Sequence, residues 1–495
     1  MAPDASVDRP FGPRLPIWLL WLLTYASAAL IGYWLWRRLG VASLELLFLD
    51  ARARIAASAP LASELLLSFP PLVFLPTLVS GSATLGAAFV MACTVAAIGA
   101  VLRGAERSLW WLALLALHPA VLVAGLEYPA VAAELGAMVI ALAGMTFYVR
   151  KRRLDWLTCG GLALGALVLV DWRAWPFPLV VAAIMAAWHR GEWREKATLM
   201  LVVLFPPLGL MAAWMAFNAM ITGQPFAFLE TPLLALSRMD AWGVQVHEGT
   251  LTRLRLAVLT GPLLLMAPVW AAAAGRHDQR TAISLMLLAA SPLVLAALAW
   301  AGDPSAPTLM AAACGLAAVL VTLTLMPRGR VRRVAGAALI LTGIAAGHGF
   351  VFADPTSEPA RLARRLATGG DSGRLSDLRQ CADWLNARMT ADDRVIFDDV
   401  QLFPLAGLLA SNEAWIPSSS AEFWIARQQP THWARFVVDV APDGPLARRA
   451  IRIDPDRLAR DYDLVRAQGE LRVFERRAKG APPMRIVFDR ASLGR

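Results

Sequence analysis

Long apolar runs alternate with short polar connections along the first 353 residues, and the pattern changes after them. A run of about 18–22 apolar residues can cross a hydrocarbon core of about 30 Å as a helix. We expect eleven spans, at residues 15–36, 83–102, 109–125, 130–148, 155–171, 174–189, 197–221, 256–274, 281–301, 307–326 and 334–352. The pattern therefore predicts a polytopic α-helical membrane protein.

The last part of the chain, residues 354–495, mixes short apolar strands with amphipathic helices. The predicted elements are a helix at 375–389, strands at 394–397 and 435–440, and a hairpin whose strands include 464–465 and 471–474 around a Gln-Gly-Glu turn. Alternating helices and strands are typical of a small α/β domain with a largely parallel sheet. We therefore expect two domains, a transmembrane domain at 1–353 and a soluble α/β domain at 354–495.

Basic residues predict the orientation of the spans. Clusters such as Arg150-Lys151-Arg152-Arg153 follow the even-numbered spans, whereas the connections 127–129 and 302–304 carry no Lys or Arg. By the positive-inside rule the N-terminus is cytoplasmic, and everything after the last span lies outside. The outward connections 37–82 and 222–255 are too long to be simple turns. The first apolar run is too long for a signal-peptide core and is expected to be a retained helix.

Composition narrows the class further. Hydrophobic residues make up 58% of the 495 positions and charged residues only 17%, whereas a soluble domain averages about 25% charged. The net charge of +10 lies mostly between the apolar spans, so it indicates topology and argues against nucleic acid as a partner. The four cysteines show no CxxC spacing, which argues against a disulfide framework or zinc site.

The first outward connection contains the clearest candidate chemistry. Residues 43–67 have an amphipathic helical pattern with Asp50, Arg52 and Arg54 among leucines, and we expect this helix to lie along the membrane interface with its apolar face in lipid. Phe69-Pro70-Pro71-Leu72 then ends it, because proline removes a backbone donor and restrains the preceding residue.

These motifs resemble the first outward loop of the GT-C membrane glycosyltransferases, in the branch of protein O-mannosyltransferases and lipid A aminoarabinose transferases. In that family an early Asp-Glu begins an interfacial helix, and a Tyr/His-Pro-Pro-Leu follows about twenty residues later. Asp50 matches the first element and Phe69-Pro70-Pro71-Leu72 the second. His118-Pro119 with Glu127-Tyr128-Pro129, and Asn218 with Gly223-Gln224-Pro225-Phe226, resemble two further family segments. Together the matches cover roughly residues 15–260.

The chain departs from the family pattern at two places. Ala51 stands where the family usually has the second acid, and Asp171-Trp172-Arg173 stands where many members have a lysine. Because of the first departure, half of the acidic pair is missing. The second keeps a cation but changes its surroundings.

The resemblance implies transfer of a sugar from a polyprenyl-phosphate donor to an envelope glycan, lipid or protein at the outer face of a bacterial inner membrane. Asp50 would then be the general base for the acceptor hydroxyl. Arginines suit the phosphate of the leaving lipid, and the candidates are Arg52, Arg54 and Arg173. Glu127 would bind the acceptor or, with Asp50, a divalent cation. Asp171 joins the candidates because ionisable groups at membrane depth are usually functional.

Plainer interpretations compete with each of these roles. Asp50 and Arg54 are spaced for an i,i+4 pair that stabilises a helix by about 0.2–0.5 kcal/mol, and Asp171 with Arg173 could form an internal ion pair. For the whole chain, Ala51 favours an inert GT-C-like scaffold in envelope polysaccharide assembly. A transporter of lipid-linked glycans is a third hypothesis, although no internal repeat is visible.

Overall fold

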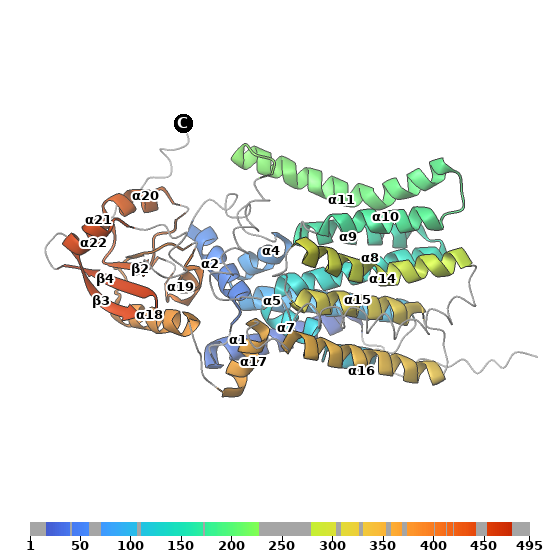
Figure 1. Ribbon diagram of the computed structural model, residues 1–495, viewed down its shortest axis with the longest axis horizontal. Helices are drawn as coiled ribbons and strands as arrows, with labels where there is room; N and C mark the ends of the chain where they lie inside the picture. The colour runs from blue at the N-terminus through green and yellow to red at the C-terminus, as the bar shows by residue number, and fades with distance from the viewer. Residues whose placement is uncertain are drawn as a thin grey trace, which may run out of the picture. The chain divides into compact units, whose positions relative to one another are not determined.

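The described residues form helices and one small sheet (Figure 1). The computed structural model describes residues 16–39, 42–58, 71–105, 110–171, 174–226, 279–302, 308–325, 330–352, 358–368, 374–399, 401–411, 413–418, 420–441 and 453–477. Contacts divide these residues into two compact units. The helical unit holds residues 16–46 and everything described from 71 to 368, and the mixed unit holds residues 47–58 and everything described from 374 onward.

The helical unit consists of helices, and most of them follow the predicted apolar runs. They are α1 (Ile17–Leu39), α4 (Pro71–Ser80), α5 (Ala83–Gly104), α6 (Trp110–Leu115), α7 (Pro119–Glu127), α8 (Pro129–Lys151), α9 (Leu154–Val170), α10 (Pro176–Trp188), α11 (Trp193–Thr222), α14 (Gln279–Gly302), α15 (Thr308–Leu325), α16 (Arg330–Phe352) and α17 (Glu358–Thr368). The predicted span 256–274 lies outside the described residues. Another helix, α2 (Leu44–Ser58), begins in this unit and continues into the mixed unit.

Four of the described helices are long and apolar enough to cross a membrane. These segments are Ile17–Trp36, Ala83–Gly104, Pro129–Lys151 and Trp193–Ile221. Large apolar side chains on α1 and α11 face outward, with Trp18, Leu30 and Phe205 each about two-thirds exposed (67%, 71% and 69%). Apolar surface of this kind indicates contact with lipid or a partner. The protein is therefore a helical protein suited to a membrane, as the sequence predicts.

The predicted single span 109–125 is wrong, because the helix is broken at His118. Pro119 has no backbone N–H and pushes the residue before it out of the helical region, and His118 indeed has an extended backbone (φ −70°, ψ 135°). The His118 imidazole accepts a hydrogen bond from the backbone N–H of Ala120 at 3.2 Å. This histidine therefore caps α7.

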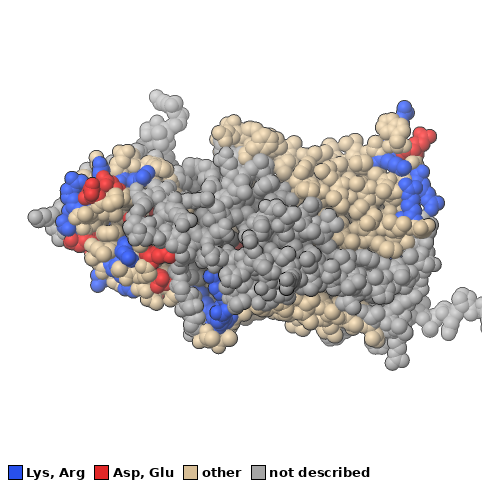
Figure 2. Space-filling view, in the orientation of Figure 1, with Lys and Arg blue, Asp and Glu red and all other residues tan. Residues whose placement is uncertain are grey.

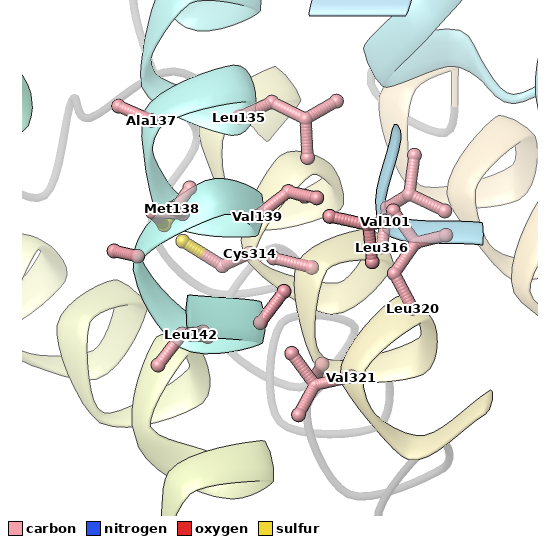
Figure 3. Close-up of a cluster of buried hydrophobic side chains, with 14 of the residues drawn as sticks. Val101, Leu135, Ala137, Met138, Val139, Leu142, Cys314, Leu316, Leu320 and Val321 are labelled. Atoms are coloured by element: carbon pink, nitrogen blue, oxygen red, sulfur yellow. The ribbon is translucent and has the colours of Figure 1, made fainter. Parts of the chain in front are cut away.

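Helices α5, α8 and α15 contribute to a core of buried apolar side chains in the helical unit. Figure 3 shows buried apolar side chains of these helices that belong to one cluster, including Val101, Met138 and Leu320. Helices α8 and α9 approach closely where small residues meet, because a Cβ added to Gly144 of α8 would lie 2.7 Å from the carbonyl oxygen of Trp156 in α9. Small residues are the usual means by which membrane helices pack backbone to backbone.

The mixed unit is built around a four-stranded sheet in the order β1-β2-β4-β3. Its elements are α18 (Arg374–Arg388), β1 (Val395–Ile396), α19 (Phe403–Leu408), α20 (Ala421–Gln428), α21 (Pro430–Trp433), β2 (Phe436–Val440), α22 (Pro455–Asp461), β3 (Tyr462–Gln468) and β4 (Leu471–Arg476). The predicted helix, strands and hairpin all form at the expected positions.

The prediction of a largely parallel sheet is wrong. Among the four described strands, β1 and β2 pair in parallel, whereas β4 runs antiparallel to both β2 and β3. The reason is local, since β3 and β4 are joined by a tight turn in which Gly469 has a positive φ of 56°, a conformation that glycine adopts without steric cost. Such a hairpin must be antiparallel.

The contacts divide the chain differently from the predicted domains. α17 groups with the helical unit, and residues 47–58 of α2 group with the mixed unit. The predicted boundary after residue 353 stays a prediction, and the outward connection 222–255 lies largely outside the described residues.

Candidate functional site

The start of α2 is fixed to the junction of α7 and α8. The backbone N–H of Ser43 donates to the Glu127 carboxylate at 2.7 Å, and the Ser43 hydroxyl donates to the Glu127 carbonyl. The same hydroxyl accepts the backbone N–H of Leu46 at 3.1 Å, as an N-cap does. The Glu45 carboxylate accepts the backbone N–H of Ala130 at 2.7 Å. Glu127, 6% exposed, therefore helps to anchor α2.

Asp50, the predicted base, forms an ion pair within α2. Its carboxylate accepts a hydrogen bond from Arg54 Nε at 2.9 Å, and the two side chains are 15% and 23% exposed. Arg54 also donates from Nη1 to the carbonyl of Leu409 at 2.5 Å. The carboxylate is thus partly accessible, and its partner connects α2 to the segment after α19.

Arg52 lies on the same helix and is almost buried, with 6% of its surface exposed. Its guanidinium carbon lies 5.5 Å from the centre of the Phe48 ring, within the range of a cation–π interaction. The Phe48 ring in turn meets Phe403 edge to face, with ring centres 5.5 Å apart. Arg52 is therefore held in a packed environment.

The prediction that α2 turns its apolar face to lipid is wrong, whereas its place along the membrane interface stays a prediction. Leu47, Leu49 and Ile55 are each at most 1% exposed, and their side chains pack against protein. An interfacial helix would leave one apolar face uncovered. The periodicity correctly predicts a helix, but it does not identify what covers the apolar side chains.

The other candidate residues lie at the end of a helix, within a helix, or outside the described residues. Asp171 follows the last residue of α9 and is 1% exposed, and its carbonyl accepts the backbone N–H of Ala174 at 3.0 Å. Arg173 lies outside the described residues, so its pairing with Asp171 stays a prediction. Asn218, which is buried, donates to the carbonyl of Trp214 at 2.8 Å within α11.

The structure thus joins Asp50 to Arg54 and Glu127 to Ser43. Asp50 and Glu127 belong to different units, and their shared role as ligands of a divalent cation stays a prediction. Within the described residues, no three His, Cys, Asp or Glu side chains come together in a way that could hold a metal ion.

Two acidic residues and one cysteine of the mixed unit also have polar side chains in or near its core. Asp399, after β1, accepts the backbone N–H of Ser418 at 3.2 Å and also its hydroxyl, and Asp398 accepts the backbone N–H of Gln401 at 3.2 Å. These carboxylates order the turns around them. Burial raises the pKa of the Cys381 thiol to about 12, so this cysteine stays protonated at neutral pH and is a poor nucleophile.

The contacts that sequence reasoning missed are those of Ser43, Glu45 and Leu409. Ser43 carried a usable signal, because serine directly before an apolar helical run is a preferred N-cap. Leu409 carried none, since its carbonyl meets Arg54 across 355 positions of sequence.

Comparison with known proteins identifies no family for this chain. No protein-family model matches the chain, and no curated protein matches it. The resemblance to GT-C glycosyltransferases therefore rests on the local motifs alone.

Proposed function

We propose that the protein is a membrane glycosyltransferase that moves a sugar from a polyprenyl-phosphate donor to an envelope glycan, lipid or protein acceptor. The observation that supports this most is the arrangement in α2 of a partly accessible carboxylate, Asp50, hydrogen-bonded to Arg54, with the buried Arg52 two residues away. The reaction needs a base for the acceptor hydroxyl and cations for the departing lipid phosphate, and one short helix supplies both.

The proposal assigns a role to each candidate residue. Asp50 takes the proton from the acceptor hydroxyl, and Arg54 orients its carboxylate. Arg52 and Arg173 stabilise the charge that develops on the phosphate as the bond to the sugar breaks, because guanidinium matches phosphate geometry. Glu127 and Asp171 orient the acceptor.

The proposed setting is a bacterial inner membrane with eleven spans, a cytoplasmic N-terminus and an outward C-terminal domain. It is supported by the two ends of α8. Lys151, Arg152 and Arg153 lie at its C-terminal end, whereas Glu127-Tyr128-Pro129 at its N-terminal end holds no Lys or Arg. Basic residues concentrate on the cytoplasmic side of membrane proteins.

An inert scaffold is the second candidate, and a specific contact favours it. Arg54 donates one hydrogen bond to the Asp50 carboxylate and another to the Leu409 carbonyl. The Asp50–Arg54 pair can therefore serve to hold α2 in the mixed unit. Ala51, 1% exposed, supplies no second acid next to Asp50. In this case the protein would bind partners in glycan assembly without transferring sugar.

Transfer of radiolabel from polyprenyl-phosphate sugars to envelope acceptors separates the two candidates. Membranes would contain the native chain, Asp50→Asn, or the matched control Asp155→Asn, whose carboxylate also pairs with a nearby arginine, Arg153, at 2.6 Å but on an exposed turn. For the enzyme we expect Asp50→Asn to lose at least about a hundredfold, the lower end of general-base contributions, and Asp155→Asn to match the native chain.

The scaffold predicts another outcome. No variant, nor the native chain, would then transfer label from any donor in a broad panel. Asp50→Asn and Arg54→Gln would loosen α2 to a similar extent, as measured by hydrogen exchange of its backbone amides. Transfer by the native chain would exclude the scaffold.

A further inference from the structure

One end of the helical unit carries an excess of positive charge. The cations are Lys151, Arg152, Arg153, Arg190, Arg194 and Lys196, and the carboxylates beside them in sequence are Asp155, Glu192 and Glu195. Lys and Arg gather at the right-hand end of Figure 2, near the connection between α10 and α11. Cations therefore outnumber carboxylates in the connections α8–α9 and α10–α11.

Arg152 is held there in an unusual way. It has a left-handed backbone, φ 58°, and no other residue except glycine has a positive φ in the described part of the chain. This conformation costs a non-glycine residue about 1–2 kcal/mol. Its guanidinium carbon lies 4.0 Å from the centre of the Trp188 ring. That ring is 3% exposed and is fixed by a 3.1 Å hydrogen bond from Nε1 to the Thr281 hydroxyl.

Lys151 and Arg194 are supported by rings as well. The Lys151 ammonium lies 5.3 Å from the centre of the Phe147 ring and 6.0 Å from that of Trp156. The Arg194 guanidinium carbon lies 5.9 Å from the centre of the neighbouring Trp193 ring. Three exposed cations at this end are thus placed against aromatic faces.

These three cations have no carboxylate partner among the described residues. At this end Arg153 forms an ion pair with Asp155, and His189 Nε2 lies 2.9 Å from Glu195 Oε2. A guanidinium that lies on a ring keeps the N–H donors at its edge for another acceptor, and these donors fit two oxygens of one phosphate. Lys151, Arg152 and Arg194 therefore keep hydrogen-bond donors that an anion can accept.

The position of these cations in the chain indicates which kind of anion they bind. Lys151 ends the membrane-spanning segment Pro129–Lys151, and Trp193 begins the segment Trp193–Ile221. Trp residues and cations at the ends of such segments lie at the level of lipid headgroups. Basic sites between helices on the cytoplasmic side bind anionic headgroups.

We propose that Lys151, Arg152 and Arg194 form a binding site for the phosphate of an anionic phospholipid, with Trp188 as its rigid floor. Arg152 contacts the phosphate most directly, and its left-handed backbone is retained because it brings the guanidinium onto the Trp188 ring. The proposal concerns lipid binding and is independent of the catalytic role of Asp50.

The test is a titration of the full chain in neutral phosphatidylcholine micelles with phosphatidylglycerol, followed by native mass spectrometry and by the thermal midpoint. One cation near an anionic surface contributes about 1 kcal/mol, so Arg152→Gln should weaken binding about fivefold. Arg153→Gln is the matched control, because Arg153 is the next residue but pairs with Asp155, and it should bind like the native chain. Arg152→Gly suits the left-handed backbone and should lose binding as well.

Three results would overturn the proposal. Equal losses in Arg152→Gln and Arg153→Gln would mean that only general surface charge attracts the lipid. Native-like binding by Arg152→Gly would mean that the guanidinium is not a ligand. Inorganic phosphate that raises the thermal midpoint as much as phosphatidylglycerol does, in phosphatidylcholine alone, would identify a site for a soluble anion instead of a lipid.

Discussion

Replacement of Arg54 by methionine tests how firmly α2 is held in the mixed unit. Arg54 donates to the Asp50 carboxylate at 2.9 Å and to the Leu409 carbonyl at 2.5 Å, and less than a quarter of its side chain is exposed. A hydrogen bond to a charged group contributes about 1.5–3 kcal/mol, and a neutral one about 1 kcal/mol. Arg54→Met keeps the apolar stem but loses both bonds, so we expect a loss of about 2.5–4 kcal/mol.

The assay is hydrogen exchange of the backbone amides of α2 in the full-length protein. About 2.8 kcal/mol corresponds to a hundredfold change in an equilibrium constant, so the α2 amides should exchange about a hundred times faster in Arg54→Met. A double-mutant cycle with Asp50→Asn should give a coupling energy of about 0.5–3 kcal/mol, as residues in one network do.

The matched control is Arg153→Met. Its pair with Asp155 is exposed by 67% and 53%, and exposed pairs contribute about 0–1 kcal/mol. We expect little change in the exchange of α9. An α2 that exchanges at the native rate in Arg54→Met, or a coupling energy of zero, would refute the conclusion that this pair holds α2.

Two further predictions concern packing and pH. Gly144→Leu should lower the thermal midpoint, because a Cβ would lie 2.7 Å from the Trp156 carbonyl and overpacking costs about 1–3 kcal/mol; an unchanged midpoint would contradict the close packing. For Asp393, burial raises the pKa of the carboxyl, but hydrogen bonds from Thr390 and Arg435 outweigh it and leave the pKa lowered. Its stabilisation is therefore complete above the unfolded value of about 3.9 and is lost as the pH falls through the folded pKa. Asp393→Asn should flatten this acid dependence in unfolding experiments, and an identical pH profile would argue against it.

Much of the helical unit can be predicted from the sequence because its signal is local. A run of apolar residues sets the length of a membrane helix directly, so α5, α8 and α9 begin and end within a few residues of the predicted limits. The hairpin of β3 and β4 is also local, since Gly469 permits its turn.

The errors have a common physical origin, which is that burial depends on distant partners. The leucines of α2 would be equally well covered by lipid or by protein, and periodicity cannot distinguish the two. The order of strands in the sheet depends on how β2 and β4 meet, and no local pattern specifies that. The break at His118 could have been predicted from the sequence, because Pro119 follows it directly.

The candidate site was predictable only in part. The i,i+4 spacing of Asp50 and Arg54 is visible in the sequence, and the pair forms as the plainer interpretation predicts. The bond from Arg54 to Leu409 and the anchoring of Ser43 by Glu127 depend on contacts between segments far apart in the chain. Such contacts also decide whether Asp50 serves as a base or as a tether.

The most direct measurement of the proposed activity is the rate of sugar transfer from a polyprenyl-phosphate donor by membranes with the native chain, compared with Asp50→Asn. We expect measurable transfer by the native chain and a loss of at least about a hundredfold in the variant, since a positioned base contributes that much. Equal transfer by the two proteins would contradict the assignment of Asp50 as the base.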